Sequence, residues 1–368
     1  TFGQSPWLDN LRRGLVTGGG LQELIDSGVR GLTSNPAIFE EAIARSGDYD
    51  EAIRDLVRQG ASTEQIYETL TTEDVRNAAD LFRPLYDESG STDGFVSYEV
   101  NPNLADDTEG TLKEARALWG LIDRPNLMIK VPATQAGLPA IRQLISEGIN
   151  VNVTLIFGLP RYKLVAEAYI DGIRDRLANG GDVRNVASVA SFFLSRIDTQ
   201  LDPKLEEIKK EGGERGERAG SLVGEVAIAS AKMAYVAYKE MFEGEAFADL
   251  AAQGAKPQRL LWASTSTKNP AYSPDKYIAP LIGENTVNTM APKSLEAYRD
   301  DGDPAPTLTD GTDEADRALS TLESLGISID EATEQLEREG VEKFVTPFSS
   351  LMDTIAKARD EAVAQTSA

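Results

Sequence analysis

The feature of this sequence that most constrains its fold is a regular alternation between short apolar segments and longer amphipathic ones. The short segments are rich in aliphatic and aromatic residues and are bounded by Gly, Pro, Asn or Asp, which is typical of strands. We predict eight strands, at residues 5–10, 29–36, 94–100, 127–131, 149–156, 185–193, 259–264 and 285–290. Because a helical pattern follows each strand, we predict an α/β fold with a single (β/α)8, or TIM, barrel.

Two helical regions are additions to this repeating pattern. Between the sixth and seventh strands, a highly charged segment at 201–220 precedes a long apolar-periodic helix at 223–242. After the eighth strand, the chain is helical apart from an acidic loop, with helices predicted at 312–325, 330–339 and 342–364 and expected to pack outside the barrel. We therefore expect one domain over residues 1–368, in which 293–368 form a helical C-terminal extension.

Composition excludes several classes of chemistry. The 368 residues include no Cys and no His, so disulfides, Cys or His zinc sites, Cys nucleophiles and His-based triads are absent. The formal net charge of −23 argues against a nucleic-acid partner. No stretch reaches the roughly 18 apolar residues that a membrane span needs, and the N-terminus lacks a signal pattern. We expect a cytoplasmic protein that does not bind membranes.

Lys130 interrupts the apolar run from Leu127 to Val131. An ammonium group is normally excluded from such a run, and a dry environment favours the neutral amine over the charged form. A neutral amine is a nucleophile and forms a Schiff base with a carbonyl substrate. The alternative is that Lys130 extends to solvent at the strand end or pairs with a carboxylate.

The clearest strand alternation lies at 149–156. Val151, Val153 and Leu155 face one way, whereas the polar side chains at 150, 152 and 154 face the other. An aliphatic outer face with a polar inner face suits a barrel wall that lines a site.

Polar residues recur where the predicted strands end. In a parallel barrel these ends meet at one mouth, where active sites are built. Each such residue taken alone could be a helix cap, a turn residue or a surface charge, but together they predict a site. The set comprises Asp9, Asn35, Glu99, Lys130, Asn152, Thr154, Ser191 and Ser264.

Four segments of the chain resemble those of a known family, the transaldolases. Residues 31–39 (Gly-Leu-Thr-Ser-Asn-Pro-Ala-Ile-Phe) and 126–134 (Asn-Leu-Met-Ile-Lys-Val-Pro-Ala-Thr) look like its two signatures. Residues 95–100 and 191–196 look like two further segments of the family. The resemblance runs from about Ser5 to Phe348, and the chain length is similar to that of the longer, bacterial-type branch.

The resemblance implies a reaction and a catalytic set. A dihydroxyacetone unit would pass from sedoheptulose 7-phosphate to glyceraldehyde 3-phosphate, giving erythrose 4-phosphate and fructose 6-phosphate in the non-oxidative pentose phosphate pathway. Lys130 would form the Schiff base, and Asp9 would be the general acid and base for carbon–carbon cleavage. Glu99 would act through a water that Thr154 holds. The resemblance implies no metal and no other cofactor.

The resemblance also implies how sugar phosphates are held. Hydrogen bonds to sugar hydroxyls would come from Asn35, Asn152 and Ser191, and we add Ser264 to the substrate-binding residues. Arg196 would bind the phosphate. Shorter members of the family carry a second phosphate-binding Arg after the seventh strand, where this chain has Lys268. Lysine binds phosphate as a point charge without the bidentate fork of arginine.

Three other functions remain open at this stage. A Schiff-base aldolase would share Lys130 and the barrel but release free dihydroxyacetone. A sugar-phosphate-binding protein without turnover would not need Lys130, Asp9 and Glu99 together. A metal-dependent barrel enzyme would have to rely on carboxylate ligands, and Asp9 and Glu99 are too few for a convincing site.

Overall fold

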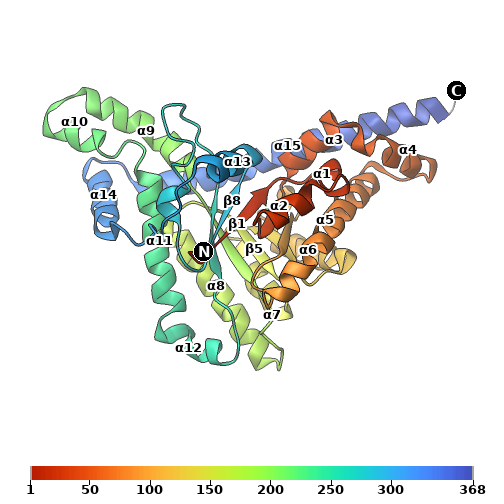
Figure 1. Ribbon diagram of the computed structural model, residues 1–368, viewed down its shortest axis with the longest axis horizontal. Helices are drawn as coiled ribbons and strands as arrows, with labels where there is room; N and C mark the ends of the chain where they lie inside the picture. Colours follow the sequence, from red (N-terminus) through yellow and green to blue (C-terminus); the bar gives the residue numbers. More distant parts are fainter. Residues whose placement is uncertain (1, 367–368) are drawn as a thin grey trace.

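Eight parallel strands close into a barrel in which each strand pairs with its neighbours in chain order (Figure 1). The computed structural model describes residues 2–366. The strands are β1 (Gln4–Asp9), β2 (Gly31–Thr33), β3 (Phe95–Glu99), β4 (Leu127–Pro132), β5 (Val151–Ile156), β6 (Ser188–Phe193), β7 (Arg259–Ala263) and β8 (Thr286–Met290). The predicted (β/α)8 fold is confirmed, although β2 is shorter than the predicted segment.

The helices surround the barrel, and some of them begin at side-chain caps. Asn35 caps α3 by accepting from the Ile38 amide, and Ser62 forms a capping box with Gln65 at the start of α5. The helices up to β6 are α1 (Arg13–Thr17), α2 (Gly20–Asp26), α3 (Pro36–Arg45), α4 (Asp50–Arg58), α5 (Thr63–Glu88), α6 (Thr108–Ile122), α7 (Gly137–Glu147) and α8 (Leu159–Ala178), with short 3-10 turns at Gly47–Tyr49 and Pro102–Leu104.

The predicted insertion between β6 and β7 is helical. It consists of α9 (Ser195–Lys210), α10 (Gly213–Gly220), α11 (Val226–Phe242) and α12 (Glu245–Ala252). After β7 a 3-10 turn, Ala279–Leu281, precedes β8, and the chain then continues through α13 (Pro292–Asp301), α14 (Thr312–Ser324) and α15 (Ile329–Thr366).

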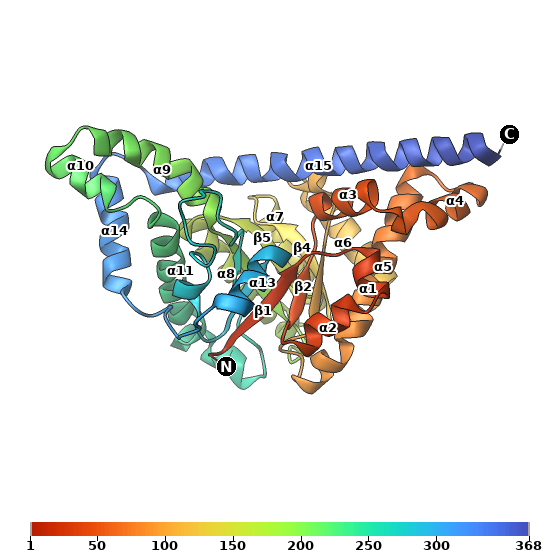
Figure 2. The same ribbon diagram turned by 45° about the horizontal axis from the view of Figure 1, so that its top comes forward.

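The last helix differs from the prediction in two ways. The two helices expected at 330–339 and 342–364 are one continuous helix, and Gly340 is helical. A Cβ at Gly340 would lie only 3.1 Å from the side chain of Leu155. The helix also does not simply pack outside the barrel wall. In Figure 2 α15 runs across the barrel, over the same side as α3 and α9. The absence of a side chain at Gly340 lets this helix approach the end of β5 closely.

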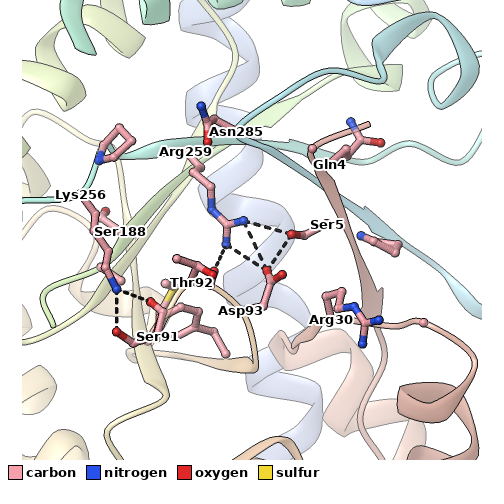
Figure 3. A pocket seen from close by; sticks show the side chains of 17 residues that line it. Gln4, Ser5, Arg30, Ser91, Thr92, Asp93, Ser188, Lys256, Arg259 and Asn285 are labelled. Atoms are coloured by element: carbon pink, nitrogen blue, oxygen red, sulfur yellow. Dashed lines mark hydrogen bonds and ion pairs between the residues drawn. The ribbon is translucent and has the colours of Figure 1, made fainter. Parts of the chain in front are cut away.

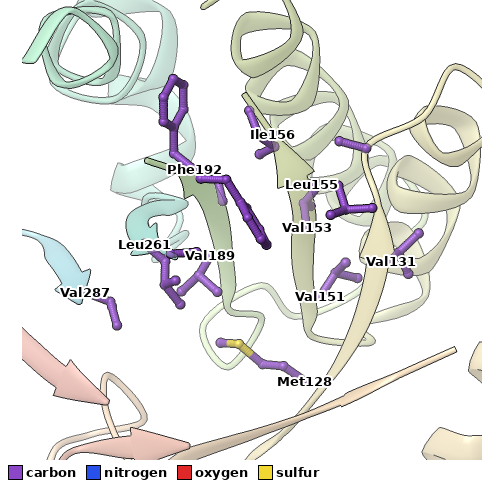
Figure 4. Packing of buried hydrophobic residues seen from close by; sticks show 14 of the residues in the cluster. Met128, Val131, Val151, Val153, Leu155, Ile156, Val189, Phe192, Leu261 and Val287 are labelled. Atoms are coloured by element: carbon purple, nitrogen blue, oxygen red, sulfur yellow. The ribbon is translucent and has the colours of Figure 1, made fainter. Parts of the chain in front are cut away.

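Apolar side chains fill part of the barrel interior. Met128, Val189, Leu261 and Val287 come from four different strands and gather between them (Figure 4). Trp7 is fully buried beside β2, where a Cβ on Gly31 would lie 2.4 Å from its ring, so only glycine fits there. This packed interior leaves chemistry to the two mouths of the barrel.

Candidate active site

A cavity of about 220 Å³ opens at the C-terminal mouth of the barrel. Eight of the ten residues predicted from sequence line it, and the two others, Glu99 and Asn152, are buried and do not belong to its lining. The predicted residues on its wall are Asp9, Asn35, Lys130, Thr154, Ser191, Arg196, Ser264 and Lys268. The structure therefore gathers at one mouth side chains that are up to 259 positions apart in the sequence.

Lys130 lies at the centre of this arrangement, and its side chain is 6% exposed. Its Nζ donates to the carbonyl of Ser34 at 3.2 Å and to Glu99 Oε2 at 3.3 Å. The same Nζ lies 5.4 Å from the ring centroid of Phe344. The carboxylate pairing considered from sequence is thus present, and it occurs in a dry site beside the cavity rather than at the surface.

Glu99 is the buried partner of Lys130. Burial raises the pKa of its carboxyl to about 7, although Lys130 acts in the opposite direction. Oε2 faces Lys130, whereas Oε1 is buried without a hydrogen-bond partner among the residues that the structure describes. A carboxyl with a pKa near neutrality and one free oxygen is suited to exchange a proton with a small molecule such as water.

Asp9 ends β1 on the cavity wall. Its Oδ1 accepts from Thr33 Oγ1 at 2.8 Å, and Thr33 Oγ1 also lies 2.7 Å from Thr289 Oγ1. Burial raises the pKa of the Asp9 carboxyl above its usual value, while Lys130, the Thr33 hydrogen bond and Lys268 oppose that shift. These hydroxyls hold the carboxylate of Asp9 in one orientation, as an acid–base group requires.

A network of hydrogen-bonded polar side chains lies beside the cavity, inside the barrel. Asn152 donates to Ser97 Oγ at 3.0 Å and accepts from Ser191 Oγ at 2.7 Å. Ser97 lies on the inner face of β3, two positions before Glu99. The structure thus places Asn152 inside a hydrogen-bonded network rather than on the wall, whereas Ser191 lies both in the network and on the wall.

A bulge in β5 interrupts the predicted alternation just after Thr154. The pairing between β5 and β6 shifts between Val153 and Ile156, and Leu155 has a φ of 61°. Leu155 therefore departs from the face expected from simple period-two alternation, because a bulge reorients the residues that it contains. Thr154 lines the cavity with a buried Oγ1 that has no partner in the described part of the chain.

The cavity is basic on the side formed by β6 and β7. Arg196 is half-buried near the start of α9, and its Cζ lies 5.3 Å from the ring centroid of Phe193. Its Nη1 is buried and unpartnered within residues 2–366. Lys268 is exposed and lies on the same wall. In a chain of net charge −23, this pair is the local feature suited to an anionic group.

Ser264 and Asn35 have structural contacts in addition to their places on the wall. Ser264 has a φ of 54°, and its hydroxyl lies 2.9 Å from that of Ser195. Asn35 uses its Oδ1 to cap α3. Asn35 is therefore a helix cap and Ser264 a residue with a structural hydrogen bond, as the alternative considered from sequence allowed. Both residues also face the cavity.

Several residues of the site were not identified from sequence. On the cavity wall, Thr33 holds Asp9, and Phe193 and Phe344 contribute aromatic surface. Behind the wall, the carbonyl of the buried Ser34 accepts from Lys130. Thr33 and Ser34 adjoin Asn35 at the end of β2, so their place in the motif was available as a signal. Phe344 is remote in sequence, and nothing local distinguishes it from other apolar residues of its helix.

Within residues 2–366, no group of three or more acidic side chains is arranged to hold a metal ion. No helix in this part of the chain is long and apolar enough to cross a membrane. The chemical groups of the site are instead an amine, two carboxyls, hydroxyls and two cations. Together with the barrel they define the class, a (β/α)8-barrel enzyme whose site is built around a lysine.

Comparison with known proteins identifies the family. Residues 6–355 match the family model described as transaldolase/fructose-6-phosphate aldolase. A transaldolase of Saccharopolyspora erythraea is 48% identical over 98% of this chain and 96% of its own. A transaldolase of Thiobacillus denitrificans is 47% identical over 96% of this chain and 97% of its own length. Transaldolase 2 of Nostoc sp. is 48% identical over 96% of this chain and 94% of its own length. The chain belongs to the transaldolase family, as its motifs predicted.

Proposed function

We propose that this enzyme transfers a dihydroxyacetone unit from sedoheptulose 7-phosphate to glyceraldehyde 3-phosphate through a Schiff base on Lys130. The observation that carries the proposal is the buried Lys130 amine, 3.3 Å from Glu99 and on the same cavity wall as Asp9. The names of the relatives and the match to the family model support the same reaction.

The proposed cycle begins with attack of the Lys130 amine on the ketose carbonyl. The carbinolamine loses water to give an iminium, and Glu99 exchanges the protons of this step through that water, with Thr154 Oγ1 as a further partner. The unpartnered, buried Glu99 Oε1 and Thr154 Oγ1 support this assignment, since both retain hydrogen-bonding capacity beside the cavity.

Cleavage then follows at the bond between the carbon next to the iminium carbon and the carbon after it, which carries the hydroxyl of the departing fragment. Asp9 takes the proton of the hydroxyl on the departing fragment, the carbon–carbon bond breaks, and its electrons move into the iminium to form an enamine. Erythrose 4-phosphate leaves. The enamine attacks the aldehyde carbon of glyceraldehyde 3-phosphate, Asp9 returns the proton, and water releases fructose 6-phosphate from Lys130. The iminium is itself the electron sink, so this chemistry uses no metal or organic cofactor.

Substrate binding is proposed to divide the wall into two parts. Arg196 and Lys268 hold the phosphate, and the unpartnered Arg196 Nη1 supports that role. Asn35, Ser191 and Ser264 hold sugar hydroxyls. Asn152 is proposed to act by orienting Ser191, in addition to the direct contact expected from sequence, because the two side chains are 2.7 Å apart.

The proposed reaction lies in the non-oxidative pentose phosphate pathway, and we propose a cytoplasmic location because its sugar phosphates are intracellular metabolites. Sugar phosphates would be its partners, and the net charge of −23 supports the expectation that nucleic acid is not one.

The test is acceptor dependence. With sedoheptulose 7-phosphate and glyceraldehyde 3-phosphate, we expect erythrose 4-phosphate and fructose 6-phosphate in equal amounts. Without an aldehyde acceptor, we expect little free dihydroxyacetone. Rapid release of dihydroxyacetone at a rate that the acceptor does not change would instead assign the chain to the aldolase activity that the family description also names.

A further inference from the structure

A second and larger cavity lies at the opposite mouth of the barrel. Its volume is about 640 Å³, within the range of small-molecule sites. Its walls come from the residues that precede or begin β1, β2, β3, β7 and β8, so it lies at the N-terminal ends of the strands. None of its lining residues belongs to the catalytic cavity.

The charge of this cavity is opposite to that of the whole chain. Its charged lining residues are Arg30, Lys256, Arg259 and Asp93, which gives three positive charges, one negative charge and a net of +2. Figure 3 shows the cations around the cavity, with Lys256 and Arg30 on opposite sides of Arg259. A protein of net charge −23 that concentrates cations at one concave site has the local field that attracts an anion.

Two of the cations have structural partners. Arg259 donates to Ser5 Oγ at 3.0 Å, to the Thr92 carbonyl at 2.6 Å and to Asp93 Oδ1 at 3.3 Å. These contacts connect β7 to β1 and to the segment before β3, so Arg259 has a structural role. Lys256 Nζ donates to the carbonyls of residues 90 and 91, each at 2.8 Å. Its partners are therefore dipoles rather than an opposite charge.

The third cation, Arg30, has no side-chain partner among the described residues that would account for its position on the cavity wall. The guanidinium of Arg30 is half-buried on the cavity wall and has no hydrogen-bond or ion-pair partner among residues 2–366. Burial lowers the pKa of the Lys256 ammonium, and the nearby charge of Arg259 adds to that effect, so these two cations repel each other. An anion in the cavity would relieve this repulsion and supply the missing partner for Arg30.

We propose that this N-terminal cavity is a binding site for a phosphate dianion, free or as the terminal group of a small phosphate monoester. A dianion matches the net charge of +2, and a guanidinium with open donors is suited to phosphate oxygens. Ser188, Thr92 and Asn285 add neutral polar groups to the wall. The volume exceeds what a phosphate alone fills, which leaves space for an organic part.

The test uses inorganic phosphate as the probe and calorimetric titration as the measurement. Because the catalytic cavity would also bind phosphate, the titrations are made in the Arg196→Ala background. We expect saturable binding there, weakened at least about tenfold by adding Arg30→Gln, the scale expected for one charge-assisted contact. Arg30 is the residue to change because it has no partner whose loss would disturb folding.

The matched control is Arg54→Gln on α4, which removes the same charge from an exposed position outside the cavity. It should leave phosphate affinity unchanged at constant ionic strength. Equal affinities for the Arg30→Gln and Arg54→Gln proteins would overturn the proposal, as would the absence of saturation up to about 10 mM phosphate, a range that covers millimolar affinity.

A parallel titration with glycerol 3-phosphate distinguishes the two sources of the anion. Tighter binding of this monoester than of phosphate would identify an organic phosphate as the ligand. Equal or weaker binding would identify free phosphate. In either case the Arg30→Gln change must weaken binding. If chloride at the same ionic strength gave the same binding signal as phosphate, the signal would reflect general charge screening and the proposed phosphate site would be rejected.

Discussion

Phe344 on α15 covers the amine of Lys130 on β4, with 5.4 Å between Nζ and the ring centroid. The two residues are 214 positions apart and meet only because α15 crosses the mouth of the barrel. The helix is held there by Arg161, which donates two hydrogen bonds to Glu337 at 2.8 and 3.1 Å. The Lys130 amine is therefore covered on one side by a helix that contributes no strand to the barrel.

A first prediction concerns this aromatic cover. Replacing Phe344 with Leu should admit water beside the proposed enamine, so that the ratio of transfer to dihydroxyacetone release falls several-fold while Schiff-base formation persists. The ratio is measured with and without glyceraldehyde 3-phosphate. Phe348→Leu is the control: Phe348 lies on the same helix and packs on Tyr67 at 5.5 Å, away from the cavity lining. Equal ratios in the two variants would show that Phe344 has only a packing role.

A second prediction separates Asp9 from Glu99. The Asp9→Ala protein should still form the Schiff base but stall before cleavage, so borohydride traps the intact donor sugar. The Glu99→Ala protein should form and hydrolyse the imine slowly, so the yield of any adduct falls. Each change should lower the rate by about 10²–10⁴, the scale of a positioned acid–base group. Accumulation of the intact-sugar adduct in Glu99→Ala would mean that the two roles are exchanged.

A third prediction follows from the raised pKa of Glu99, which is about 7 because the carboxyl is buried. The carboxylate is the form that accepts a proton from water, and it becomes dominant only above that pH. We therefore expect kcat/KM to rise about tenfold per pH unit below pH 7 and to level off above it. Glu99→Gln should lower the activity and remove this limb. A limb near pH 7 that persists in Glu99→Gln would assign it to another group.

A fourth prediction concerns phosphate recognition. Arg196→Ala should weaken binding of phosphorylated substrates by about 1.5–3 kcal/mol, which appears as a higher KM, because a charge-assisted hydrogen bond is lost. Activity on an unphosphorylated ketose should change little. Arg196→Lys should recover part of the loss, since it restores the charge without the fork. Equal losses with both kinds of substrate would show that Arg196 is structural.

Much of the site could be predicted because it follows from local patterns. Strand periodicity and the sites of strand ends place Asp9, Lys130 and Thr154 at one mouth of a parallel barrel, and Lys130 is visible as a charge within an apolar run. The motif resemblance then extended the set to Arg196. The roles assigned to these residues remain predictions, since geometry alone does not test them.

The remainder depends on long-range packing that no local pattern encodes. Phe344 reaches Lys130 only through the path of α15. Two helices were predicted on either side of Gly340, whereas this residue lies inside one helix and permits close packing on Leu155. The bulge at Leu155 interrupts the strand whose alternation is the clearest in the sequence. Arg30 and Arg259 lie 229 positions apart, so their shared cavity is a product of barrel closure.

The most direct test of the central claim is borohydride reduction in the presence of fructose 6-phosphate, followed by peptide mapping by mass spectrometry. The proposed mechanism predicts a three-carbon adduct on Lys130 and its complete loss, together with activity, in Lys130→Ala. Lys113 and Lys163 serve as internal controls and should remain unmodified. An adduct on either of these lysines, or activity that survives Lys130→Ala, would contradict the assignment of Lys130 as the Schiff-base residue.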